Sequence, residues 1–184
     1  MNVAGERTFA ASRATVWSVL NDPESMAKTM PGVESFDVHD ERRWTANVKI
    51  PLGLGGLKMK VDMEKIEERE PEFAKLAIKG NGVGAMMNME TSFTLGDAPE
   101  GGTAMAWSAD VRIAGPIGSM GQRVLQPIVN QQVQHVLTAL DRQVQEAIGS
   151  GAGPAPHGAE EGISPVSPEA YEPDPEGPTT STED

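Results

Sequence analysis

The chain has 184 residues, contains no cysteine and carries a formal net charge of −12 at pH 7. The lack of cysteine excludes a disulfide scaffold, a thiol catalyst and a cysteine metal site. The negative charge argues against a nucleic-acid partner, and no apolar run reaches the ~18 residues of a membrane-spanning helix. The first residues also lack the pattern of a signal peptide.

The charge divides the sequence into two parts. Residues 150–184 hold eight acidic residues, no lysine or arginine and half of the prolines, so they carry −8, whereas residues 1–149 carry only −4. A segment of this composition buries too little apolar surface to offset the entropy lost on ordering. We therefore expect a globular domain over residues 1–149 and a disordered, acidic, proline-rich tail over residues 150–184.

The N-terminal part of the domain predicts one strand and two short helices. Residues 3–11 fit a strand, and Ser12 is a suitable N-cap for a first helix. Asp22 and Pro23 can begin a second helix, since aspartate caps well and proline suits the first helical position. The Pro-Gly pair at 31–32 should end it.

From Val33 onward the apolar residues recur with a period of two, which is typical of half-buried antiparallel strands. Six such segments precede Gly115, and turn residues separate them. After Gly115 the pattern becomes helical to about Ile148. A long helix is the simplest cover for the apolar face that such strands leave open. The sequence thus predicts an α+β fold, a curved antiparallel sheet around a long C-terminal helix, with two short helices after the first strand.

This order, together with several short motifs, resembles a known family over roughly residues 2–148. The motifs are residues 15–24, 30–33, 51–56, 82–84, 102–103 and 115–121. They are similar to those of the CoxG family of carbon monoxide dehydrogenase subunits, within the START-like (SRPBCC) helix-grip superfamily. The chain departs from that family at Val33, where a cysteine is typical.

The resemblance implies a function as well as a fold. It implies a non-enzymatic domain that binds an apolar ligand between the sheet and the C-terminal helix. It further implies association with a molybdenum-containing CO dehydrogenase and with the inner face of the cytoplasmic membrane. A quinone (menaquinone or ubiquinone) or another isoprenoid lipid would be the bound ligand, because the electrons of such an enzyme must reach a lipid-soluble acceptor. We expect a cytoplasmic, peripherally membrane-associated monomer.

The positions of the methionines suggest where the ligand lies. Five of the ten fall on predicted inward strand positions, and Met120 falls on the apolar stripe of the helix. Methionine is flexible and polarizable, so it suits a cavity wall, although ordinary core filling explains the pattern equally well. The candidate ligand-binding residues are Met59, Val61, Met63, Met87, Met89, Phe93, Met105, Trp107, Ile113, Met120, Val124 and Ile128.

Two glycine-containing turns carry apolar residues that are candidates for a membrane contact or portal. Leu52 and Leu54 lie at one hairpin tip, and Val83 and Met86 lie in the other turn. Exposed apolar residues at tips often mark a contact with a membrane or partner. Alternatively, the leucines fold back over the mouth of the sheet.

The sequence predicts no catalytic or metal site. The histidines His39, His135 and His157 lack metal-ligand spacing, and no Ser-His-Asp arrangement can be assembled. The long helix carries a cluster of amide residues, Gln122, Asn130, Gln131, Gln132 and Gln134. One or two of them could hydrogen-bond a quinone carbonyl, whereas we expect most of them to be exposed to solvent.

Two other functions remain open for this fold. A polyketide cyclase-like enzyme would need inward acid–base groups, and none is convincing. A docking or assembly protein for the dehydrogenase would have a filled core, so a cavity below about 300 Å³ would favour it. The acidic tail is either a tether to a basic surface of the partner or a passive solubilising segment.

Overall fold

The computed structural model describes residues 1–51 and 56–151. Seven strands form one antiparallel sheet in the order β1-β7-β6-β5-β4-β3-β2. The strands are β1 (Asn2–Phe9), β2 (Val33–Val38), β3 (Arg43–Ile50), β4 (Leu57–Arg69), β5 (Phe73–Gly82), β6 (Ala85–Asp97) and β7 (Thr103–Ala114). The helices are α1 (Arg13–Asn21), α2 (Pro23–Thr29), the single turn η1 (Gly118–Met120) and α3 (Gln122–Gly149).

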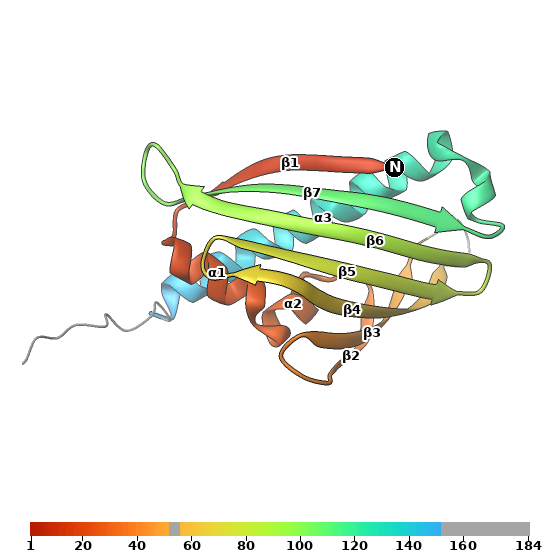
Figure 1. The fold of residues 1–184 in the computed structure, drawn as a ribbon, viewed down its shortest axis with the longest axis horizontal. Helices are drawn as coiled ribbons and strands as arrows, with labels where there is room; N and C mark the ends of the chain where they lie inside the picture. The colour runs from red at the N-terminus through yellow and green to blue at the C-terminus, as the bar shows by residue number, and fades with distance from the viewer. Residues whose placement is uncertain (52–55, 152–184) are drawn as a thin grey trace, which may run out of the picture. The chain divides into compact units, whose positions relative to one another are not determined.

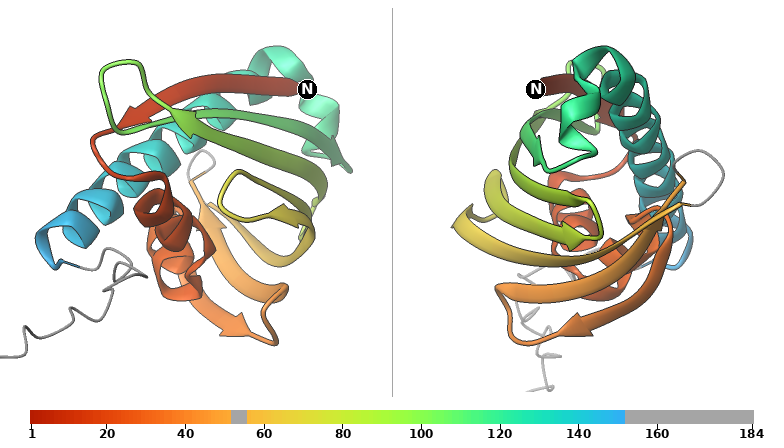
Figure 2. Two further views of the ribbon diagram at one scale, coloured as in Figure 1. Left: turned by 60° about the vertical axis from the view of Figure 1, so that its left-hand side comes forward. Right: turned by 90° about the vertical axis from the view of Figure 1, so that its right-hand side faces the viewer.

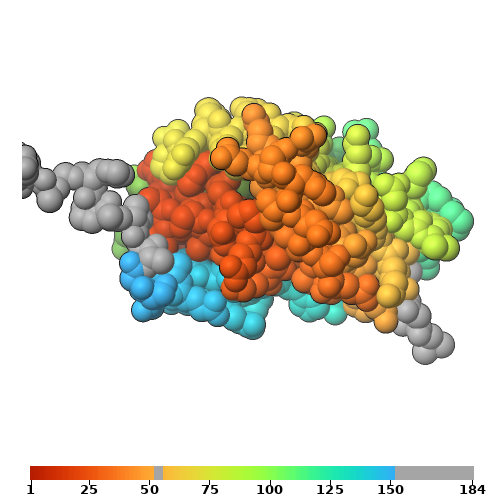
Figure 3. Space-filling view, turned by 90° about the horizontal axis from the view of Figure 1, so that it is seen from below, coloured from red at the N-terminus to blue at the C-terminus, as the bar shows by residue number. Residues whose placement is uncertain are grey.

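The sheet curves around α3, as Figures 1 and 2 show. On the side seen in Figure 3, α1 and α2 (red to orange) lie between α3 (cyan to blue) and the β4–β5 hairpin (yellow). The predicted α+β helix-grip architecture is therefore confirmed, including the two short helices after the first strand. From residue 152 on, the predicted acidic tail lies outside the described residues.

Both predicted helix caps are present. The Ser12 hydroxyl accepts a hydrogen bond from the Thr15 N–H at 3.2 Å and caps α1. The Asp22 carboxylate accepts one from the Ser25 N–H at 2.8 Å and caps α2. The Asp22 N–H also donates to the Ser18 carbonyl at 2.9 Å. Asp22 therefore joins the end of α1 to the start of α2.

Replacing Asp22 by alanine should lower the free energy of unfolding by about 1 kcal/mol, because the cap bond at the start of α2 is lost. Urea denaturation followed by circular dichroism measures this change. Asp22→Asn keeps the oxygen acceptor and should retain most of the stability. Equal losses in the two variants would mean that the charge of Asp22, and not its capping bond, stabilises this junction.

The C-terminal helix begins later than its apolar pattern suggests. Gly121 has a positive φ of 80° and separates the turn η1 from α3. The side chains before this glycine therefore do not continue the face of α3. This explains why Met120, predicted to lie on the apolar stripe, is instead exposed.

Two clusters of buried side chains hold the elements together. The first joins α1 and the C-terminal half of α3 to one end of the sheet, with Val16, Trp17 and Val144 at its centre. The second lies on the inward face of β3, β4 and β5 and includes Trp44 and Val61. Several members of these clusters, Leu140 of the first and Val61 of the second among them, also face a space that the sheet and α3 enclose.

Candidate functional site

A cavity of about 420 Å³ lies between the inward face of the sheet and α3. Side chains from every strand except β2 contribute to its wall, and α2 contributes Met26 and Thr29. Among the described residues that line it, none is an aspartate, glutamate, histidine, lysine or arginine. The volume falls within the range of about 300–1,000 Å³ that is usual for small-molecule sites.

The cavity brings together ten of the twelve candidate ligand-binding residues. These are Met59, Val61, Met63, Met87, Met89, Phe93, Met105, Trp107, Ile113 and Ile128. Their contact with a ligand stays a prediction. Several of those on β6 and β7, Met87 and Trp107 among them, are only half-buried. They are less buried because their side chains face open space rather than a packed neighbour.

Met120 and Val124 do not line the cavity, contrary to the prediction. Their side chains are 48% and 44% exposed. The helical spacing of the apolar residues at 117, 120, 124 and 128 is real, but Gly121 interrupts the backbone within it. The face of α3 that covers the cavity starts instead at Leu125, which is buried.

Sequence analysis missed two groups of lining residues. One comes from the region of α1 and α2, as Leu20, Met26 and Met30. The other is the face of α3 that follows Leu125. It consists of Val129, Val133, Val136, Leu137 and Leu140. Gln132 lies on the same face and is one of the five amides that the sequence marks as possible partners of a quinone carbonyl. Spacings of three and four residues from Leu125 identify the helical group. The first group depends on how α2 packs, which no local pattern reports.

A glycine in β5 helps to shape the wall. A Cβ atom at Gly80 would lie 2.8 Å from the Met59 Cε and 3.3 Å from the Met87 Cβ. Glycine therefore leaves space in which the two methionine side chains can lie over β5. Methionine adapts its shape readily, so this part of the wall can accommodate ligands of different outline.

Two polar groups in the wall are buried without a hydrogen-bond partner among the described residues. They are the Trp107 Nε1 and the side-chain amide of Gln132, both Nε2 and Oε1. The indole of Trp107 lies against Gly5 in the neighbouring strand β1, where a Cβ would be 2.9 Å from its Cζ2 atom. An unpartnered buried polar group costs about 1–3 kcal/mol of stability, so these groups are a notable feature of an otherwise apolar wall.

Exposed apolar side chains gather at one end of the domain. Val83 and Met86, in and beside the β5–β6 turn, are 94% and 56% exposed. The Ile117 N–H donates to the Gly84 carbonyl at 3.0 Å and holds the β7–α3 connection, which carries Met120, beside this turn. Figure 1 shows the turn and the connection at the same end of the molecule. We call Val83, Met86, Met120 and Val124 the apolar end.

The structure describes two of the four candidate portal residues. Leu52 and Leu54 lie outside the described residues. Val83 and Met86 are exposed and do not line the cavity. Their contact with a membrane stays a prediction. No helix of the described residues is long and apolar enough to cross a membrane.

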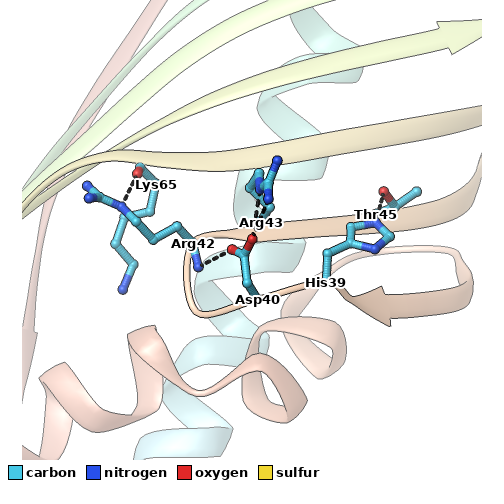
Figure 4. A network of polar contacts seen from close by, with 6 residues as sticks. All are labelled: His39, Asp40, Arg42, Arg43, Thr45 and Lys65. Atoms are coloured by element: carbon cyan, nitrogen blue, oxygen red, sulfur yellow. Dashed lines mark hydrogen bonds and ion pairs between the residues drawn. The ribbon is translucent and has the colours of Figure 1, made fainter.

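A network of polar contacts that includes His39 lies at the β2–β3 turn (Figure 4). His39 Nε2 is 2.8 Å from the Thr45 Oγ1. Asp40 accepts from the Arg42 N–H at 2.9 Å and pairs with Arg43 at 2.7 Å. The hydrogen bond from Arg43 lowers the pKa of Asp40. Since none of these residues lines the cavity, the network stabilises a turn and is no candidate for chemistry there.

Within residues 1–51 and 56–151, no three metal-ligating side chains come together. His135 lies with Lys28 and Arg142 in a second, smaller hollow beside α2, and carboxylate ligands are absent from its described lining.

A curved antiparallel sheet that grips a long C-terminal helix, with an apolar cavity between them, defines a START-like helix-grip protein. The family model for CoxG, a subunit of carbon monoxide dehydrogenase, matches residues 5–145. The chain belongs to this family. None of the curated proteins matches the sequence.

Solved structures share the fold at low sequence identity. A conserved protein from Geobacillus kaustophilus is 20% identical with a TM-score of 0.74, over 80% of this chain and 97% of that one. A START superfamily protein from Mycobacterium smegmatis is 16% identical with a TM-score of 0.60, over 79% and 97%. The Zhui aromatase/cyclase from Streptomyces sp. R1128 is 14% identical with a TM-score of 0.62, over 83% and 98%.

Proposed function

We propose that this protein is a non-enzymatic carrier that binds a quinone, such as menaquinone or ubiquinone, or a similar isoprenoid lipid in the cavity between sheet and α3. The observation that carries the proposal is a cavity of about 420 Å³ with an apolar wall that includes flexible methionines. Burial of apolar surface contributes about 25 cal/mol per Å². A lipid that buries about 300 Å² there would gain roughly 7 kcal/mol before the entropy cost of binding.

The family suggests where such a carrier acts. Its name ties CoxG to carbon monoxide dehydrogenase, and we propose that this chain links a molybdenum enzyme of that type to the membrane and its quinone pool. The apolar end supports a membrane contact, because exposed apolar side chains gathered at one end are unusual in a protein that has no partner there. In this proposal the lipid enters and leaves while that end touches the inner face of the cytoplasmic membrane.

Lipid analysis tests the carrier proposal directly. Protein purified without detergent from a quinone-containing bacterium should release a quinone or another isoprenoid lipid on solvent extraction, detected by mass spectrometry. Native mass spectrometry of the same sample should show the lipid on the intact chain and report the oligomeric state. Protein that is always empty and also takes up no added menaquinone would overturn the proposal.

Replacing Val83 by aspartate should slow the transfer of short-tailed menaquinone from phosphatidylglycerol–phosphatidylethanolamine vesicles by about 5- to 10-fold, since burying a charge at the membrane surface is costly. Val38→Asp is the matched control, because Val38 is an exposed valine in β2, far in the sheet order from β6 and β7. Stopped-flow measurement of menaquinone transfer reports the rate. Equal rates for both variants would mean that the apolar end does not contact the membrane.

A cyclase-like enzyme is the second candidate, favoured by the shared fold of the Zhui aromatase/cyclase. At 14% identity this likeness concerns the fold alone. Such chemistry needs an acid or base beside the substrate, and the described wall residues include no ionisable side chain. Conversion of a polyketide substrate by the purified protein would favour the enzyme over the carrier.

A docking protein without a ligand is less compatible with the cavity. A filled core, with a cavity below about 300 Å³, would favour such a protein, and the cavity of about 420 Å³ is larger.

A further inference from the structure

Most of the buried polar side-chain atoms without a hydrogen-bond partner, among the residues that the structure describes, belong to residues of the cavity wall. Five buried side-chain atoms lack a hydrogen-bond partner among the described residues, and three of them belong to Gln132 and Trp107 in the cavity wall. The other two lie outside that wall. Arg13 uses its remaining guanidinium nitrogens in ion pairs, and the ring of Trp44 lies 5.9 Å from the Lys65 ammonium.

The remaining polar side chains of the wall, Thr29, Thr91 and Ser92, have hydrogen-bond partners in the protein. The Thr29 hydroxyl donates to the Met26 carbonyl at 2.8 Å, and the Thr91 hydroxyl donates to the Ser108 carbonyl at 3.0 Å. The Ser92 hydroxyl lies 3.3 Å from that of Ser108. Buried polar groups are normally paired with a donor or acceptor of the protein or with water. Gln132 and Trp107 therefore stand out as groups whose partners are absent from the protein itself.

The position of Gln132 on α3 strengthens this point. Its neighbours on the cavity face, such as Ile128, Val129 and Val136, are apolar, whereas the adjacent Gln131 is exposed to solvent. An apolar side chain at position 132 would continue the face without loss of hydrogen bonds. An amide at this position is explained if the ligand supplies its partner.

We propose that Gln132 and Trp107 form a polar site that binds the oxygen-bearing head group of the lipid inside the cavity. This inference rests on the proposed carrier function. A quinone has two carbonyl oxygens, and both the Gln132 Nε2 and the Trp107 Nε1 can donate to such an oxygen. The polar site thus selects an oxygenated lipid over a pure hydrocarbon, while the apolar wall supplies most of the binding energy.

The chemistry of an amide extends the inference to the reduced form of the ligand. A quinol hydroxyl donates a hydrogen bond, and the Gln132 Oε1 can accept it. Rotation of the amide exchanges its donor and its acceptor, so one side chain serves either form. The Trp107 N–H donates to the oxygen in both cases. The carrier should therefore bind quinone and quinol with similar affinity, without any redox step on the protein.

The same residues define the orientation of the ligand. Trp107 packs against the first buried cluster, as Leu137 of α3 also does. It lies seven residues from Ala114, where β7 ends, which corresponds to about 23 Å of strand. The connection that carries Met120 of the apolar end follows directly. The head group would then lie deep in the cavity and the isoprenoid tail would point toward the apolar end.

Substitution of Gln132 by methionine tests the polar site, with Gln131→Met as the exposed control on the same helix. The probes are a short-tailed menaquinone, its anaerobically reduced menaquinol and squalene, an isoprenoid without oxygen. The unchanged protein should bind menaquinone and menaquinol within about 3-fold of each other. Q132M should weaken both by about 10-fold, the effect of one or two neutral hydrogen bonds. Squalene binding should stay the same or tighten, and Q131M should match the unchanged protein.

A second variant tests the other donor of the polar site. Trp107→Phe keeps an aromatic ring but removes the indole N–H, so it should also weaken the binding of menaquinone and menaquinol.

Thermal unfolding of the ligand-free variant separates this role from a structural one. Without a ligand, Q132M should melt about 2–4 °C higher than the unchanged protein, because an unpartnered amide is removed from an apolar wall. A lower melting temperature would assign Gln132 to the structure. Equal menaquinone affinity in Q132M and the unchanged protein would overturn the polar site and leave the carrier intact. Failure of the unchanged protein to bind any of the three probes would instead overturn the carrier proposal.

Discussion

Replacing Ala109 by tryptophan should lower the affinity for menaquinone by roughly 100-fold or more. Ala109 lies on β7, is buried and lines the cavity. An indole at this position would occupy a large part of the 420 Å³ that is open to a ligand. If the ligand loses about 150 Å² of buried apolar surface, the loss is about 4 kcal/mol, which exceeds a 100-fold change in affinity. Fluorescence titration with short-tailed menaquinone measures the change.

The matched control for this variant is Ala106→Trp. Ala106 lies three residues away on the same strand, but its side chain is exposed on the opposite face of the sheet. This variant should bind menaquinone as the unchanged protein does. The new indole in A109W enters an existing space. The free energy of unfolding of the A109W protein should therefore differ from that of the unchanged protein by less than about 2 kcal/mol. A stable A109W protein that still carries lipid would show that the ligand lies somewhere other than in this cavity.

The strands and the faces of the sheet could be predicted because a period of two leaves little ambiguity. Once Met59, Val61 and Met63 share one face of β4, a one-residue shift would expose all three. The start of α3 could not be predicted in the same way. Met120 and Val124 have helical spacing, and only the backbone at Gly121, with its positive φ, reveals the interruption.

The wall of the cavity was predictable in part, for a physical reason. Inward positions of a curved sheet must face the helix that covers it, so alternation identified residues such as Met89 and Trp107. Which amide of the long helix lies inside depends on how α3 is rotated against the sheet. Gln131 and Gln132 are the same residue type, and only packing exposes one and buries the polar atoms of the other. The contribution of α2 likewise follows from tertiary contacts alone.

Replacing Trp17 by alanine should lower the free energy of unfolding by about 4 kcal/mol, the largest stability effect that we expect from a single substitution in α1. Trp17 is 5% exposed and belongs to the first buried cluster. Its ring meets that of Phe93 edge to face, with 5.9 Å between centroids. Unlike Trp107, it does not line the cavity. The two tryptophans should therefore separate stability from ligand binding.

Urea denaturation followed by circular dichroism measures the effect, with two variants for comparison. Trp17→Phe keeps an aromatic ring near Phe93 and should lose about half as much stability as Trp17→Ala. Ile148→Ala, at a partly exposed position of α3, should change the free energy of unfolding by less than about 0.5 kcal/mol. A loss as small in W17A as in I148A would mean that the first cluster does not hold α1 and α3 to the sheet. The helix α3 would then need another anchor over the cavity, because these contacts hold its C-terminal half to the sheet.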